Sequence, residues 1–316
     1  MKAAVVNVLG HPPQYQDFPE PVAADGEAIA EMRAIGLHPV VKAIASGKHY
    51  SSSGQVPAVA GIDGVGLLGG RPVYCFPARR QSGSMAERVA VEPQKCIPLP
   101  EGLGPEQAAA IANPGMSAWL SLTLRAGLVA GETVLIQGAT GVAGQLAIQA
   151  ARYLGAGKII AAGRSREALE TLGADAVVVL SDPDEAVSEA YAAQIRDRGI
   201  DVVIDYLWGR PTELLLEAIA RGFRPEATRR TRLVEVGESA GRTITLPGAI
   251  LRSTDLTMAG SGFGSVPLDR IMGAIPTLFS LAAAGHLRVA VESVPLSQVE
   301  QAWNAGEKGK RLVFTI

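Results

Sequence analysis

The chain has 316 residues, of which 47% are apolar and only 5% aromatic, and it contains 36 glycines. This length allows two domains with full cores, and the composition favours an α/β protein with many tight turns. The formal net charge of −2 argues against a nucleic acid or an anionic membrane as the partner. Two cysteines, Cys75 and Cys96, cannot form a disulfide framework or a four-thiolate zinc lobe, and we interpret both as buried apolar residues.

The N-terminal segment predicts a first strand rather than a signal peptide, because its apolar stretch is short and Pro12-Pro13 follow soon after. Two long uncharged stretches, 107–124 and 133–151, have the composition of membrane spans. The first is interrupted by Asn113-Pro114-Gly115, and the second contains a glycine turn whose backbone would be unsatisfied in lipid. We therefore expect no membrane span and a soluble, cytoplasmic protein.

The first hundred residues predict a compact, largely antiparallel β domain. Short β-like runs at 3–8, 27–35, 71–76 and 86–91 are separated by Gly and Pro turns. A helix is expected at 106–111, and Asn113-Pro114-Gly115 is expected to interrupt it before a second helix at 117–125.

From Thr133 onward, strands and helices alternate regularly. Strand-like segments lie at 133–137, 158–162, 176–180, 201–206, 232–236 and 255–260. Such alternation predicts a doubly wound parallel sheet. The elements beyond Gly264 no longer fit this pattern, and we expect them to complete the first domain: a helix at 269–284, a strand at 289–294, a helix at 298–305 and a strand at 311–316.

The most informative motif is a glycine turn between the apolar run 134–136 and a helix expected at 145–154. Gly138, Gly141 and Gly144 recur at a spacing of three residues. In a βαβ unit such glycines let the backbone approach a pyrophosphate at a helix N-terminus. The alternative is a βαβ turn that binds no ligand.

The end of the next strand bears on which dinucleotide would bind. An NAD site has an Asp or Glu there, which bonds the ribose 2′-hydroxyl, whereas this chain has Gly163 followed by Arg164, Ser165 and Arg166. These donors suit a 2′-phosphate, so we expect NADP(H); the alternative for Arg164 and Arg166 is an ordinary solvated helix start. The predicted cofactor-binding residues are Gly138, Ala139, Thr140, Gly141, Val142, Ala143, Gly163, Arg164, Ser165 and Arg166.

Further short segments, in this order and spacing, carry a resemblance that runs over nearly the full length: Gly36-Leu37-His38-Pro39, Ile44-Ala45-Ser46-Gly47, the turn from Pro57 to Gly66, Ser84-Met85-Ala86-Glu87, Gly115-Met116-Ser117-Ala118 and Lys308-Gly309-Lys310. With them the chain resembles the medium-chain dehydrogenase/reductase superfamily, specifically its zinc-independent quinone oxidoreductase (zeta-crystallin-like) branch. The resemblance implies a GroES-like, mostly antiparallel β catalytic domain (1–115 and 265–316), a Rossmann NADP-binding domain (116–264) and a homodimer. It also implies cofactor contacts from Gly237, Ser261, Phe263 and Lys310.

The resemblance also bears on metal. The positions that look equivalent to the catalytic zinc ligands of alcohol dehydrogenases are His38, Ile62 and Asn113. Isoleucine cannot ligate a metal and an asparagine amide is a poor zinc ligand, so no metal site is expected. The quinone branch usually has Asn where this chain has His38 and Asp where it has Val41.

The candidate catalytic residues are His38, Tyr50 and Asn113, which the family layout would place near the nicotinamide. His38 either donates a hydrogen bond or proton to a reduced acceptor oxygen or is a structural imidazole fixed before Pro39. Tyr50 either faces the substrate or packs, and Asn113 either contacts the nicotinamide or acceptor or breaks a helix. Asp205, at the end of a strand, is interpreted as structural.

Without a metal, reduction of an electron-poor acceptor remains feasible, because nicotinamide supplies the hydride and the protein mainly positions it. The leading prediction is an NADPH:quinone oxidoreductase acting on a quinone or similar activated carbonyl. An enoyl-thioester or alkenal double-bond reductase would use the same hydride chemistry. A third possibility, of another class, is a non-catalytic NADPH-binding sensor or structural protein.

Overall fold

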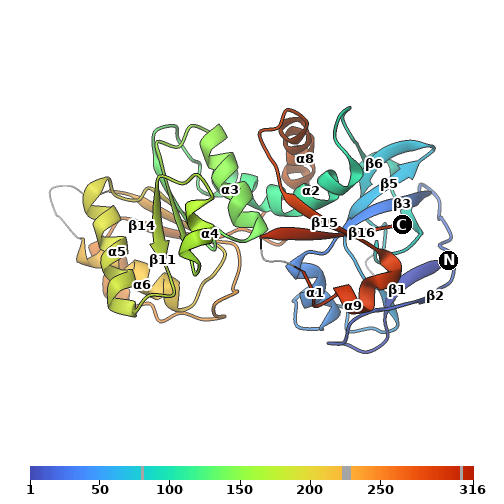
Figure 1. The fold of residues 1–316 in the computed structure, drawn as a ribbon, viewed down its shortest axis with the longest axis horizontal. Helices are drawn as coiled ribbons and strands as arrows, with labels where there is room; N and C mark the ends of the chain where they lie inside the picture. Colours follow the sequence, from blue (N-terminus) through green and yellow to red (C-terminus); the bar gives the residue numbers. More distant parts are fainter. Residues whose placement is uncertain (80–81, 223–228, 307–308) are drawn as a thin grey trace. The chain divides into compact units, whose positions relative to one another are not determined.

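A computed structural model describes residues 1–79, 82–222, 229–306 and 309–316. The chain divides into two compact units, one formed by Met1–Pro114 with Ile275–Ile316 and the other by Gly115–Ala274. We call them the β unit and the parallel-sheet unit (Figure 1). Among the described residues, no helix is long and apolar enough to cross a membrane.

The β unit is built on two sheets. In the smaller one, β1 (Lys2–Val6) pairs antiparallel with both β2 (Gln14–Asp17) and β4 (Ala58–Val59). The larger one has the order β15–β16–β3–β5–β6–β8, with β7 also on β3. Its strands are β3 (Ala28–Gly36), β5 (Gly64–Leu68), β6 (Arg71–Cys75), β7 (Arg88–Val91), β8 (Ile97–Pro98), β15 (Ala290–Pro295) and β16 (Lys310–Thr315).

Buried and more exposed side chains alternate along β3. Ala30, Met32 and Ala34 are buried, whereas Glu31 is exposed and Arg33 is half-buried, as a strand with one face on a core requires. The expected antiparallel β domain is therefore present. The C-terminal elements complete it, because β16 pairs antiparallel with β3 and parallel with β15.

The helix before the glycine turn differs from the expectation. α2 (Pro105–Leu120) runs without a break through Pro114, and Ser121–Arg125 then forms a π-helical turn. A proline inside a helix costs about 3 kcal/mol, and burial of the apolar run Ala108–Ala112 just before it offsets that cost. Tertiary packing overrides the local signal here, so the predicted interruption at Asn113-Pro114-Gly115 is wrong.

The remaining helices that lie wholly within the β unit are short. α1 (Pro39–Ala45) begins with proline at its first position, where the missing N–H costs nothing, and η1 (Pro93–Lys95) is a single 3₁₀ turn. α8 (Leu268–Ala283), which begins in the parallel-sheet unit and ends in the β unit, contains Pro276 and matches the expected helix. A 3₁₀ turn, η3 (Leu296–Gln298), leads into α9 (Val299–Ala302), which is shorter than the predicted helix at 298–305.

The parallel-sheet unit confirms the doubly wound prediction. Its strand order is β11–β10–β9–β12–β13–β14, and every pairing is parallel. The strands are β9 (Thr133–Gln137), β10 (Lys158–Gly163), β11 (Ala176–Val179), β12 (Val202–Asp205), β13 (Thr231–Glu235) and β14 (Leu256–Gly260). The chain winds outward from β9 in both directions, so the topological switch lies between β9 and β12.

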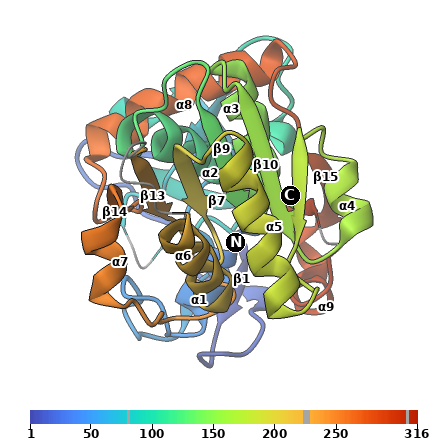
Figure 2. The same ribbon diagram turned by 90° about the vertical axis from the view of Figure 1, so that its left-hand side faces the viewer.

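Helices cover both faces of this sheet. One face packs on α5 (Asp184–Asp197), α6 (Arg210–Arg221) and α7 (Gly248–Ser253), and α5 and α6 lie side by side (Figures 1 and 2). α3 (Val142–Tyr153) contacts β9 and β10. Its buried residues are not part of the core that α5, α6 and α7 form with the sheet. α4 (Arg166–Glu170) follows β10. Binding loops are consequently expected at the carboxyl ends of the strands.

Candidate functional site

The glycine turn joins β9 to α3 at the carboxyl edge of the sheet. Gly138 adopts a left-handed conformation with φ of 80°, and the N–H groups of Gly138 and Ala139 both donate to the carbonyl of Ala162 on β10. A Cβ at Gly144 would lie 2.4 Å from the Gly138 carbonyl oxygen. The first turn of α3 can therefore approach the turn this closely only with glycine at position 144.

The beginning of α3 is open to an anion. Its N-cap residue, Gly141, provides no side-chain hydrogen bond, so the first N–H groups of the helix, at Val142 and Ala143, lack the usual side-chain acceptor. With the positive end of the helix dipole, these groups form a cradle suited to a phosphate. The glycine turn fits the pyrophosphate of a dinucleotide on this geometry.

The end of β10 lies beside the turn. A Cβ at Gly163 would lie 3.2 Å from Leu169 Cδ2 and 3.3 Å from Thr140 Cγ2, so little room exists there for a carboxylate side chain. The guanidinium of Arg164 is exposed and forms no ion pair within the described part of the chain. Arg166, by contrast, is 3.9 Å from an Asp182 oxygen.

The side chain of Ser165 caps the helix that follows β10. Its Oγ accepts a hydrogen bond from the Ala168 N–H and caps α4. The hydroxyl can still donate to a ligand. Arg164 is therefore the residue of this segment that is most available to an added phosphate.

The loops after β13 and β14 supply the other predicted cofactor residues of this unit. A Cβ at Gly237 would lie 3.1 Å from the Tyr206 carbonyl oxygen. Ser261 donates its N–H to the carbonyl of Glu235, at 2.8 Å, and accepts a hydrogen bond from the Ser121 hydroxyl at 2.9 Å. Phe263 is 46% exposed. The structure thus gathers Gly138–Ala143, Gly163–Arg166, Gly237 and Ser261 at one edge of the sheet.

His38 lies in a buried polar cluster of the β unit. It is fully buried, and its Nε2 lies 3.3 Å from an oxygen of Asp63. The other oxygen of Asp63 accepts a 2.7 Å hydrogen bond from the Tyr74 hydroxyl. The imidazole lies directly over Gly36, where a Cβ would be 2.7 Å from His38 Cε1.

Burial controls the electrostatics of this cluster. It lowers the pKa of His38 below its ordinary value, against the opposing effect of Asp63. Burial also lowers the pKa of Arg311, to about 10, while this guanidinium donates to the Leu37 carbonyl at 2.7 Å. A neutral, enclosed imidazole favours the structural alternative for His38.

The other predicted residues of the β unit have different surroundings. Tyr50 is 76% exposed, and its ring stacks at a tilt on His49 with centroids 4.1 Å apart. Asn113 is half-buried within α2, so it does not break the helix. Lys310 is exposed at the start of β16, and Lys308 lies outside the described residues. Within the described chain, no hydrogen bond or ion pair joins His38, Tyr50 and Asn113 to one another.

The residues present do not fit a catalytic zinc. Within the described ranges, no group of three or more His, Cys, Asp or Glu side chains is arranged to hold a metal. Ile62 carries no donor atom, and the His38 ring is directed at Asp63.

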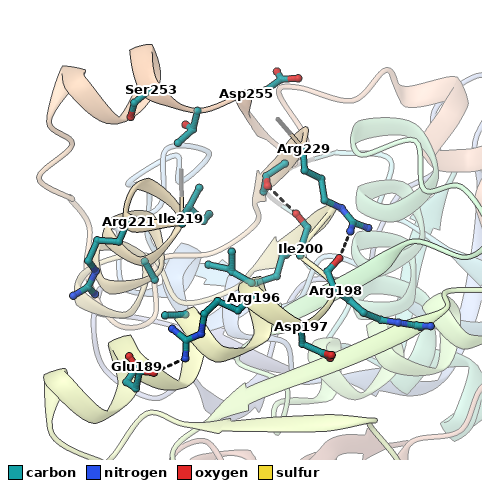
Figure 3. A pocket seen from close by; sticks show the side chains of 17 residues that line it. Glu189, Arg196, Asp197, Arg198, Ile200, Ile219, Arg221, Arg229, Ser253 and Asp255 are labelled. Atoms are coloured by element: carbon teal, nitrogen blue, oxygen red, sulfur yellow. Dashed lines mark hydrogen bonds and ion pairs between the residues drawn. The ribbon is translucent and has the colours of Figure 1, made fainter. Parts of the chain in front are cut away.

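A large cavity lies elsewhere in the parallel-sheet unit. It has a volume of about 630 Å³ and is lined at the amino ends of strands, by Ile200, Thr231 and Asp255 among others (Figure 3). Arg196 there pairs with Glu189. This edge is opposite the glycine turn, and the cavity lining contains no residue of that turn.

The chain is similar to known dehydrogenases and reductases. Residues 142–280 match the family model described as zinc-binding dehydrogenase. The chain is 28% identical to "Probable NADPH-dependent quinone reductase tdiC" of Emericella nidulans, over 99% of both chains. It is 26% identical to prostaglandin reductase-3 of Bos taurus, over 89% of this chain and 76% of the relative. The quinone oxidoreductase of Thermus thermophilus, which has also been solved in complex with NADPH, is 30% identical, with full coverage of both chains and a TM-score of 0.77.

A glycine turn on a doubly wound parallel sheet, joined in one chain to a mostly antiparallel β unit, defines a dinucleotide-dependent dehydrogenase/reductase of the medium-chain superfamily. Within that superfamily, the chain belongs to the quinone oxidoreductase family. The family predicted from the sequence is confirmed.

Proposed function

We propose that this protein is an NADPH-dependent oxidoreductase that transfers hydride to a quinone or a similar activated carbonyl acceptor without a metal. The observation that carries the proposal is the open N-terminus of α3 beside the carboxylate-free end of β10, where Arg164 is free of ion pairs among the described residues. The names of the Emericella nidulans and Thermus thermophilus relatives support NADPH as the cofactor.

Residues of the chain bind the cofactor and orient it. The N–H groups at Val142 and Ala143 hold the pyrophosphate, and Arg164 pairs with the 2′-phosphate. Gly237, Ser261 and Phe263 border the rest of the cofactor, and Lys310 is proposed as a further contact. Bound NADPH supplies the hydride, so the protein needs to provide mainly position and exclusion of water.

For the acceptor, we propose contacts from Tyr50 and Asn113. A quinone that accepts hydride develops negative charge on oxygen, and a phenol or amide donor lowers the barrier by stabilising it. Tyr50 has an exposed ring, so its hydroxyl can donate a hydrogen bond to an acceptor without any rearrangement of the core. His38, buried against Asp63, is proposed to order the segment before α1, and a direct donation to the acceptor is the alternative.

A second candidate is reduction of a carbon–carbon double bond in an enoyl thioester or alkenal. The similarity to prostaglandin reductase-3 favours keeping it. The same hydride chemistry serves both acceptors, since pocket shape decides which one is positioned. A non-catalytic NADPH-binding role is the remaining alternative, of another class.

Stopped-flow oxidation of bound NADPH across quinones, enones and enoyl thioesters tests the proposal. Rapid oxidation by quinones is the expected result. Rapid oxidation by enoyl thioesters alone would replace the first candidate by the second. Tight NADPH binding with no oxidation by any acceptor would leave the non-catalytic role.

We also propose a homodimer located in the cytoplasm. β14 is an edge strand of the parallel sheet, and its unpaired backbone groups favour pairing with a second copy about a two-fold axis. A dimer mass by light scattering at micromolar concentration is expected, and a monomer mass would reject this assembly.

A further inference from the structure

Asp205 is a fully buried carboxylate at the end of β12. One of its oxygens accepts hydrogen bonds from the N–H groups of Leu207 and Trp208, at 2.9 and 3.0 Å. The other accepts a 2.5 Å hydrogen bond from the Thr212 hydroxyl in α6. Burial raises the pKa of Asp205, and all three hydrogen bonds oppose that rise. One side chain therefore holds the middle of the loop 206–209 and the first turn of α6.

A second layer of buried polar groups supports Thr212. The Gln137 amide donates to the Thr212 hydroxyl at 3.3 Å, and its carbonyl oxygen accepts from the Tyr191 hydroxyl at 2.7 Å. Gln137 is the last residue of β9, directly before the glycine turn. The network thus joins β9, α5, α6 and the end of β12. Buried polar groups that satisfy one another in this way specify a single arrangement.

The loop that Asp205 fixes lies against two cofactor segments. A Cβ at Gly138 would lie 3.2 Å from side-chain atoms of Tyr206 and Leu207. A Cβ at Gly237 would lie 3.1 Å from the Tyr206 carbonyl oxygen. Trp208 has φ of 55°, a left-handed conformation that is unfavourable for a large side chain and persists only where neighbours hold it.

The position of this loop in the sheet assigns it to one half of the cofactor. Arg164, the 2′-phosphate partner of the proposed function, follows β10 on one side of β9, whereas the loop 206–209 follows β12 on the other side. A dinucleotide crosses the sheet at this switch point. The loop therefore borders the nicotinamide half, away from the adenosine 2′-phosphate.

We infer that Asp205 is a positioning residue for the nicotinamide half of NADP(H), acting through the loop 206–209. This inference rests on the proposed use of NADP(H). Sequence reasoning gave Asp205 a structural role only and did not single out the loop, although Gly209 soon after a parallel strand marks a tight turn.

Two ligands separate positioning from general stability. NADPH carries both halves of the cofactor, whereas adenosine 2′,5′-bisphosphate carries the 2′-phosphate and lacks the nicotinamide. For Asp205→Ala, we expect the Kd of NADPH to rise about tenfold or more, with the Kd of the bisphosphate within about twofold of wild type. Thr212→Val, which removes one partner of Asp205 at similar volume, should give the same pattern with a smaller rise. It serves as the test if Asp205→Ala does not fold.

Asp201 offers a matched control in the same segment of chain. It is a buried carboxylate, 6% exposed, that accepts the Thr133 N–H at 2.8 Å, but it precedes β12 at the amino edge of the sheet. Asp201→Asn should lower the melting temperature while leaving the ratio of the two Kd values at its wild-type level.

The two Kd values distinguish a positioning role of Asp205 from a merely structural one. A rise in the NADPH Kd alone supports the inference. An equal rise for both ligands, or an unchanged NADPH Kd, overturns it, because a merely structural role acts on both halves. Wild-type protein that bound neither ligand would overturn the proposed function as well as this inference.

Discussion

Replacing Arg164 by alanine tests the choice between NADPH and NADH. Arg164 directly follows β10, its guanidinium is exposed, and no ion pair holds it within the described residues. Gly163 before it leaves little space for the carboxylate that would bond a free ribose. The wild-type protein should therefore bind NADPH more tightly than NADH, and most of the difference should depend on this one side chain.

The magnitude follows from one charge-assisted contact. Such a hydrogen bond to a phosphate contributes about 1.5–3 kcal/mol, which corresponds to roughly 10- to 100-fold in affinity. Because the guanidinium is exposed, solvent screening places the effect near the lower end. We expect NADPH to bind about tenfold more tightly than NADH in the wild type, and Arg164→Ala to bring the two affinities within about threefold.

Titration of protein with each reduced nucleotide, followed by nicotinamide fluorescence, gives both Kd values. Arg152→Ala is the matched control, because it removes the same charge from the last turn of α3, where Arg152 pairs with Asp175 at 3.1 Å. The control should keep the wild-type ratio. Equal affinities for NADPH and NADH in the wild type, or an unchanged ratio in Arg164→Ala, would refute the assignment of Arg164 to the 2′-phosphate.

Three further outcomes are expected. Gly144→Ala should lower the melting temperature and weaken NADPH binding, because its Cβ would lie 2.4 Å from the Gly138 carbonyl oxygen. Such overpacking costs about 1–3 kcal/mol. The control Gly273→Ala, which places its Cβ in open space within α8, should be neutral or stabilising in the same thermal scan. The unfolding free energy should fall as pH drops below the ordinary His38 pKa of 6.5, because the folded-state pKa is lower and the unfolded chain takes up the proton first. His38→Gln should flatten that decline in urea titrations at several pH values, and an equal slope in both proteins would contradict it. Purified protein should contain no stoichiometric zinc by elemental analysis, and chelators should leave NADPH oxidation unchanged, because Ile62 offers no ligand; activity lost on chelation and restored by zinc would oppose this.

Local patterns in the sequence were sufficient for the fold of the parallel-sheet unit. The apolar run ending at Gln137, the glycines after it and the helix that follows are contiguous, so spacing alone predicted the turn and the parallel sheet. The missing carboxylate at Gly163 was likewise visible in the sequence. These features depend on backbone periodicity and on glycine's small size, which the order of residues specifies directly.

Only the tertiary structure decided what packs on these segments. α2 continues through Pro114 because the buried apolar run Ala108–Ala112 offsets the cost of the proline, and no local signal carries that balance. His38 faces Asp63, a residue distant in sequence, which is why the sequence left its role open. Asp205 and Tyr191 belong to one network only because β9 and β12 become neighbours in the sheet. Contacts between distant segments depend on which faces come together, and a single sequence does not specify that by spacing.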